Sequence, residues 1–160
     1  MKTIIACLDF SDVTEPVVQT AAYLARETKA MLFLLHSVPV QPPVAVDSYV
    51  VSPAQDMGRD LQRADERLAQ WRAQLKNEGI QVFVVVRRGA ATANILVQIG
   101  RLHADMVVMG SHGHGALHHL LMGSTAEQVI RKANCPVVIV PSRVAAAAAI
   151  ESPDMAMAEI

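Results

Sequence analysis

The residues best suited to chemistry lie in one glycine-rich segment, residues 109–125, with the sequence MGSHGHGALHHLLMGST. It follows a continuous apolar run and precedes a stretch of helical periodicity. Glycines at 110, 113 and 115 permit positive φ and remove side-chain bulk, so backbone N–H groups can converge on an anion. Gly123, Ser124 and Thr125 would add the free N–H groups of a helix N-terminus, where the macrodipole also favours phosphate. The segment therefore predicts a phosphate-binding loop.

The elements that position this loop form a regular alternation. Short continuous apolar runs alternate with amphipathic segments, a pattern that predicts a parallel sheet with helices on both faces. The expected strands are Thr3–Leu8, Ala30–His36, Ile80–Val86, Asp105–Met109 and Pro136–Val140. The first expected helix has Ser11 or Asp12 as its N-cap, and the third spans about 92–102. The fourth expected helix starts at Ser124. The second carries an apolar stripe made of Leu61, Ala64, Leu68, Trp71 and Leu75.

The position and composition of the loop exclude two common phosphate-binding motifs. A Walker loop requires Gly-Lys-Ser/Thr, and none of the lysines falls within the glycine-rich stretch. The dinucleotide fingerprint should follow the first strand, whereas this loop follows the fourth. The pattern argues against kinase and dehydrogenase functions.

The spacing Gly-x2-Gly-x9-Gly-Ser, formed by Gly110, Gly113, Gly123 and Ser124, resembles the ATP-binding signature of the universal stress protein family. The segments LDFS at 8–11, LHSV at 35–38 and NCPVV at 134–138 extend the resemblance over about 1–142. It implies a Rossmann-like α/β domain over 1–142, a single doubly wound sheet of five parallel strands in order 3-2-1-4-5 with four helices. The nucleotide would lie across the ends of strands one and four. The resemblance does not cover residues 143–160, whose alanine run and position after the last strand predict a flexible or weakly helical tail.

The resemblance also implies a set of ATP-binding residues. Asp9 would accept hydrogen bonds from ribose hydroxyls, the backbone around Ser37 and Val38 would contact adenine, and Met109 would pack near the base or ribose. The glycine loop would hold ribose and phosphates, and many relatives carry arginine where this chain has His114 and His119. The full expected set is Asp9, Ser37, Val38, Met109, Gly110, His112, Gly113, His114, Gly123, Ser124 and Thr125.

Simpler structural roles remain open for several of these residues. Ser124 and Glu127 have the spacing of a capping box, and Asp9 could cap the first helix. The loop histidines could suggest zinc, but they lack cysteine or acidic co-ligands and a regular ligand spacing, so we expect no protein-only metal site. Magnesium held by the phosphates is favoured instead. His36 is expected to be a satisfied structural histidine and His103 to be exposed.

Composition limits the remaining possibilities. Lys and Arg total 14 against 15 for Asp and Glu, so no basic surface for nucleic acid is expected. No segment has the length and apolarity of a membrane span, and no signal pattern begins the chain, so we expect a soluble cytoplasmic protein. Cys7 and Cys135 are predicted to be reduced core thiols. Residues 39–53 are expected to form a lid or surface loop.

Together these features predict an ATP-binding regulatory module of the stress response rather than an enzyme, with no catalytic residues assigned. One alternative is a slow Mg²⁺-dependent ATPase, although the loop offers no evident general base or charged finger. The other is a structural dimer that does not retain nucleotide. In the family's strand order, Pro136–Val140 lies at a sheet edge, so we expect a homodimer through this strand.

Overall fold

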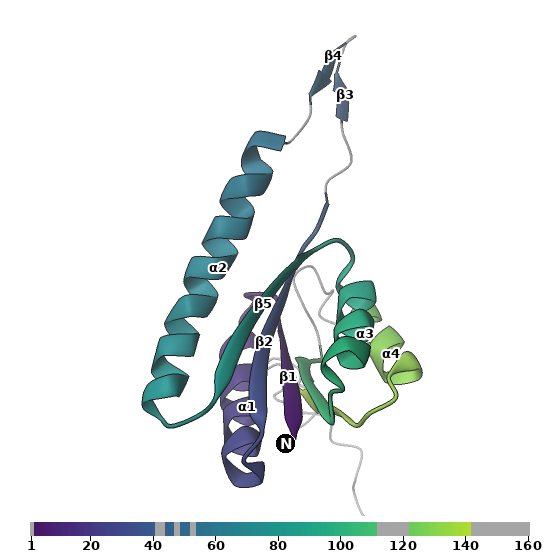
Figure 1. Cartoon of the computed structure of the whole chain (residues 1–160). Coiled ribbons are helices and arrows are strands. Elements are labelled where there is room, and N and C mark those ends of the chain that lie inside the picture. The colour runs from purple at the N-terminus through teal and green to yellow at the C-terminus, as the bar shows by residue number, and fades with distance from the viewer. Residues whose placement is uncertain (1, 41–43, 47–48, 52–53, 112–121, 142–160) are drawn as a thin grey trace, which may run out of the picture.

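The computed structural model of the chain describes residues 2–40, 44–46, 49–51, 54–111 and 122–141. Its main sheet is parallel and runs in the order β5-β2-β1-β6-β7 (Figure 1). The five strands are β1 (Thr3–Leu8), β2 (Met31–Val38), β5 (Val82–Arg88), β6 (Met106–Gly110) and β7 (Val137–Val140). Counted along the chain this order is 3-2-1-4-5, so the predicted topology is confirmed. Each strand lies within two residues of its expected bounds.

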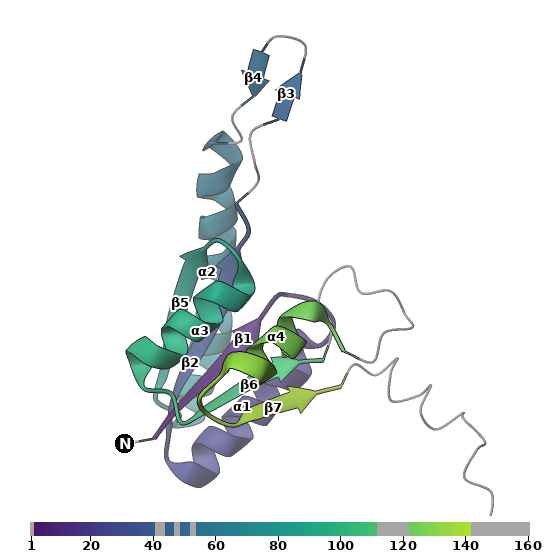
Figure 2. The same cartoon turned by 90° about the vertical axis from the view of Figure 1, so that its right-hand side faces the viewer.

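Helices cover both faces of this sheet, as the continuous apolar strands require. One face carries α1 (Thr14–Thr28) and α2 (Ala54–Asn77), and the other carries α3 (Ala91–Leu102) and α4 (Ser124–Lys132) (Figures 1 and 2). The apolar stripe expected on the second helix packs inward, because Ala64, Leu68 and Leu75 are buried. Trp71 is half-buried and packs against the same cluster, so its predicted core role is confirmed.

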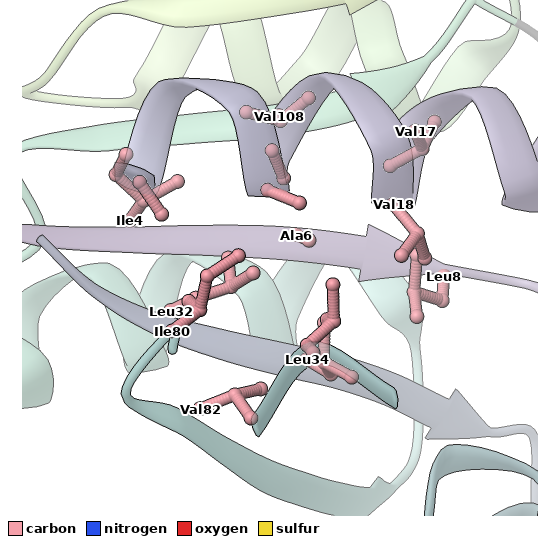
Figure 3. Close-up of a cluster of buried hydrophobic side chains, with 14 of the residues drawn as sticks. Ile4, Ala6, Leu8, Val17, Val18, Leu32, Leu34, Ile80, Val82 and Val108 are labelled. Atoms are coloured by element: carbon pink, nitrogen blue, oxygen red, sulfur yellow. The ribbon is translucent and has the colours of Figure 1, made fainter. Parts of the chain in front are cut away.

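The alternation of side chains along β1 creates two separate cores. Ile4, Ala6 and Leu8 face α1 and α2, where they meet buried valines of α1 (Figure 3). Ile5 and Cys7 face α3 and α4 instead. Burying one such aliphatic side chain contributes about 1.5–3 kcal/mol. The central strand is therefore held from both sides, which fixes the position of its carboxyl end.

The two cysteines lie on the α3 and α4 side of the sheet as free thiols. Cys7 and Cys135 are both partly buried against this second core. Burial raises the pKa of Cys7 to about 12, with Cys135 adding a smaller effect. Burial also raises the pKa of Cys135. Both thiols therefore stay protonated at neutral pH, in agreement with the predicted reduced core cysteines.

Residues 39–53 contain structure that the sequence did not predict. Strands β3 (Val44–Val46) and β4 (Tyr49–Val51) pair antiparallel, with Val44 opposite Val51 (Figure 2). The expectation of a lid or surface loop did not include this pairing, which the β-branched residues of the run favour. The expected tail at 143–160 lies outside the described residues. Within the described chain, no helix combines the length and apolarity needed to cross a membrane.

Candidate functional site

Strand register brings the expected site residues to one edge of the sheet. Cys7 of β1 pairs with Met109 of β6, so Asp9, which follows β1, lies near Gly110 at the end of β6. On the other side of β1, Leu8 pairs with His36 of β2, which places Ser37 and Val38 just beyond it. Chain order reverses between β1 and β6, and open α/β sheets bind ligands at such a switch point. The fold therefore collects these residues where a ligand is expected.

Burial divides this row of residues. Val38 and Met109 are buried, and Met109 packs into the core beneath α3 and α4. Asp9, Ser37 and Gly110 are half-buried. The apolar residues of this edge are thus buried in the core, and the polar residues are more exposed to solvent.

Asp9 organises the turn that follows β1. Its Oδ1 accepts hydrogen bonds from the Ser11 hydroxyl at 2.6 Å, the Ser11 N–H at 3.1 Å and the Thr14 hydroxyl at 3.5 Å. Helix α1 begins later than expected, with Val13 as its N-cap and no side-chain capping bond. The predicted N-caps Ser11 and Asp12 are therefore wrong, because Val13 holds that position. Asp9 is not the N-cap residue either, although it accepts a hydrogen bond from the side chain of Thr14, the first residue of α1.

The residue after Asp9 is held in an unusual conformation. Phe10 has φ 64°, a left-handed value that is strained for a bulky side chain. The centre of its ring lies 4.3 Å from the centre of the His36 ring and 4.1 Å from the guanidinium carbon of Arg67. The His36 Nδ1 is 2.7 Å from the Leu8 carbonyl oxygen, in agreement with the structural role predicted for this histidine. This stack fixes the backbone beside Asp9.

Two backbone hydrogen bonds fix the base of the glycine-rich segment. The Ser111 N–H donates to the Val140 carbonyl at 2.8 Å, and the Gly123 N–H donates to the Ser111 carbonyl at 2.7 Å. The expectation of a free N–H at Gly123 is therefore wrong. Gly110 ends β6 without a positive φ, so its conformational freedom is not used. The expected residues His112, Gly113 and His114 lie outside the described residues.

Helix α4 starts without a side-chain cap. Its N-cap is Gly123, with φ −74° and ψ 151°, so Ser124 is already the first helical residue. The capping-box interpretation of Ser124 and Glu127 is therefore wrong, and Glu127 pairs instead with Arg131 at 2.7 Å. The N–H groups of Ser124, Thr125 and Ala126 have no partner within the described part of the chain. This start offers donors for an anion at the carboxyl end of β6.

Asn94 is a polar residue of this edge that sequence reasoning did not single out. Its Nδ2 donates to the Ser37 hydroxyl at 3.2 Å and to the Arg88 carbonyl at 3.1 Å. Gly89, with φ 110°, donates its N–H to the Val38 carbonyl at 2.9 Å. The local signal was an asparagine in the first turns after Arg88-Gly89, but its approach to Ser37 depends on the pairing of β2 with β5.

Comparisons with known proteins agree with this geometry. The profile of the universal stress protein family matches residues 1–141. A universal stress protein of Methanocaldococcus jannaschii is 28% identical over 144 residues, covering 87% of this chain and 81% of the relative. The structure of universal stress protein UspA from Lactobacillus plantarum has the same fold, with a TM-score of 0.72 and 20% identity over 87% of this chain and 97% of that one. The universal stress protein from Archaeoglobus fulgidus in complex with dAMP has a TM-score of 0.60 and 25% identity, over 87% and 96% of the two chains.

Proposed function

Because this chain belongs to the universal stress protein family, we propose that it is an adenine-nucleotide-binding module whose bound nucleotide controls its conformation or its partner interactions. The nucleotide we propose is ATP, with its phosphates at the start of α4 and its ribose at Asp9. The family relative from Archaeoglobus fulgidus that was solved with dAMP supports an adenine nucleotide as the ligand.

The open N-terminus of α4 at the end of β6, the strand that pairs with β1, is the observation that carries this proposal. The hydrogen bond from Gly123 to Ser111 holds this N-terminus at the end of β6, next to the strand that ends at Asp9. Free helical N–H groups bind phosphate, and a carboxylate accepts hydrogen bonds from ribose hydroxyls. Neighbouring strands thus supply the two kinds of group that a nucleotide needs.

We propose a binding function rather than hydrolysis. The Oδ1 of Asp9, the acid at this edge, already accepts hydrogen bonds from Ser11 and Thr14, which suits a fixed acceptor better than a general base. The described residues include no cluster of three or more metal-binding side chains. We propose that Mg²⁺ binds through the phosphates of the nucleotide.

Mass analysis of the nucleotide released from the purified, denatured protein tests the proposal directly. We expect an adenine nucleotide in the released fraction. We also expect saturable heat in calorimetry when ATP and Mg²⁺ are added to the protein after nucleotide has been removed. An empty protein that shows no saturation up to millimolar ATP would favour the structural dimer.

We further propose that β7 forms a homodimer interface. It lies at the edge of the sheet and pairs with β6 alone among the described strands, leaving a row of backbone groups for a second copy. Val138→Lys should give a monomer in light scattering, because a half-buried valine would become a charge in the interface. Phe83→Lys on the opposite edge strand β5 is the matched control and should leave the dimer intact. A Val138→Lys dimer would refute this interface.

A further inference from the structure

The side-chain amide of Asn94 has a fixed orientation. The Arg88 carbonyl can only accept a hydrogen bond, so the amide nitrogen of Asn94 must face it, at 3.1 Å. The second hydrogen of the same nitrogen goes to the Ser37 hydroxyl at 3.2 Å. Rotating the amide by half a turn would set its oxygen against the Arg88 carbonyl oxygen. The backbone of β5 thus determines which amide atom is used for other contacts.

This orientation leaves one acceptor and one donor at the end of β2. Both hydrogens of the Asn94 nitrogen are used, and its Oδ1 accepts no hydrogen bond in the described part of the chain. Because the Ser37 oxygen accepts from Asn94, its own hydrogen is available to another acceptor. Both side chains are half-buried, which strengthens hydrogen bonds relative to those in water.

An adjacent acceptor and donor complement the edge of adenine. Adenine carries a 6-amino donor beside a ring-nitrogen acceptor. We propose that Asn94 and Ser37 read the base, with Asn94 Oδ1 accepting from the 6-amino group and the Ser37 hydroxyl donating to the neighbouring ring nitrogen. This inference rests on the proposed nucleotide-binding function and specifies its base. Guanine would present its 6-carbonyl oxygen to Asn94 Oδ1, and the amide cannot turn without losing the Arg88 bond.

A double-mutant cycle between the protein and the ligand tests this pair. ATP and purine riboside triphosphate, which lacks the 6-amino group, are titrated into the unaltered chain and into Asn94→Ala. In the unaltered chain we expect the analogue to bind about tenfold more weakly, the loss of one net hydrogen bond. In Asn94→Ala this difference should shrink to about twofold or less, because the partner of the amino group is gone. Val97→Ala, an exposed change on the same helix, should behave like the unaltered chain.

Ser37→Ala keeps the test decisive if Asn94→Ala does not fold, because it removes a single hydroxyl. It should weaken ATP binding about fivefold, again the loss of one hydrogen bond. One of the two analogues 1-deaza-ATP and 7-deaza-ATP should bind the unaltered chain more weakly than ATP, because it lacks the ring nitrogen that accepts from Ser37. In Ser37→Ala that analogue and ATP should bind equally well. GTP should bind the unaltered chain far more weakly than ATP.

Two other outcomes would overturn the inference, and they differ in what they leave standing. In the first, the missing amino group weakens binding equally in the unaltered chain and in Asn94→Ala, and the deaza analogue stays weaker than ATP in Ser37→Ala. This result would refute base recognition by Asn94 and Ser37 but would leave nucleotide binding standing. An unaltered chain that binds neither ATP nor GTP would remove the proposed function, and the inference with it.

Discussion

Helices α1 and α4 both begin at the carboxyl edge of the sheet, and their first turns differ. At α1, the Thr14 N–H donates to the Ser11 carbonyl at 3.1 Å, Pro16 has no N–H, and Glu15 adds a negative charge. At α4, the first three N–H groups lack partners within the described chain, and the N-cap residue is glycine. Among the first three residues of α1, only Glu15 has an N–H without a partner in the described chain, whereas α4 has three such N–H groups.

The difference indicates that a helix N-terminus at this edge is not by itself suited to bind an anion. The macrodipole points the same way in both helices, but only unpaired donors without a nearby acidic charge give phosphate a favourable place. In α4 the acidic residue of the first turn, Glu127, forms an ion pair with Arg131 on the helix surface. We therefore expect substitutions at α4 to affect binding, and substitutions in the turn before α1 to affect stability as well.

The largest effect is expected from filling the N-cap of α4. The side chain of an N-cap residue reaches the N–H groups of the second and third helical residues, so Gly123→Val would cover donors that phosphate needs. The φ and ψ of Gly123 are ordinary for valine, so the fold should tolerate the change. We expect ATP affinity, measured by calorimetry, to fall about a hundredfold. This loss corresponds to about 3 kcal/mol of binding free energy, similar to the cost of forcing an extra side chain into a packed site.

Gly123→Asp sharpens the same prediction. Its carboxylate would occupy the free donors and stabilise the helix by about 0.5 kcal/mol while repelling phosphate. An unchanged or slightly higher melting temperature together with lost ATP binding would separate binding from stability. Gly100→Val is the control, because a side chain at Gly100 meets open space. If Gly123→Val and Gly100→Val bind ATP equally well, the start of α4 is not the phosphate site.

A smaller effect is expected from Asp9→Asn, which tests the other helix start. An asparagine oxygen can still accept from Ser11 and Thr14, so stability should change by less than about 1 kcal/mol. Loss of the charge should weaken ATP binding about tenfold, since a hydrogen bond to a charged group contributes about 1.5–3 kcal/mol. Calorimetry and thermal unfolding are the measurements. Ser11→Ala should show the reverse, a lower stability with little change in ATP affinity. If Ser11→Ala loses as much affinity as Asp9→Asn, Asp9 only stabilises the turn and does not contact the nucleotide.

The smallest effect is expected from Ser124→Ala. The Ser124 side chain makes no capping bond, so the free energy of unfolding should change by only a few tenths of a kcal/mol, roughly the normal range for a surface substitution. Thermal unfolding measures this change. ATP affinity should fall about threefold if the hydroxyl adds one donor to phosphate. A marked drop in stability would restore the capping-box interpretation that the structure contradicts.

The sequence determined the parts of the fold that depend on local pattern. Apolar runs marked the strands, and the stripe from Leu61 to Leu75 marked the inward face of α2. Local pattern placed the start of α4 correctly at Ser124, but it did not identify the N-caps. Ser124 and Glu127 have the spacing of a capping box, and Ser11 and Asp12 are good N-cap residues, yet the N-caps are Gly123 in α4 and Val13 in α1. The hairpin β3–β4 was missed because its two strands are only three residues long.

The sequence by itself determined the glycine spacing, the polar residues after the strands and the resemblance to a nucleotide-binding family. The tertiary structure decided which of these groups are free and which are neighbours. It placed Asp9 beside Gly110, used the Gly123 N–H to close the base of the loop, and brought Asn94 to Ser37 across 57 positions of sequence. The physical reason is that pairing between parallel strands joins residues far apart in the chain, and no local pattern of residue types specifies the partner of a given donor.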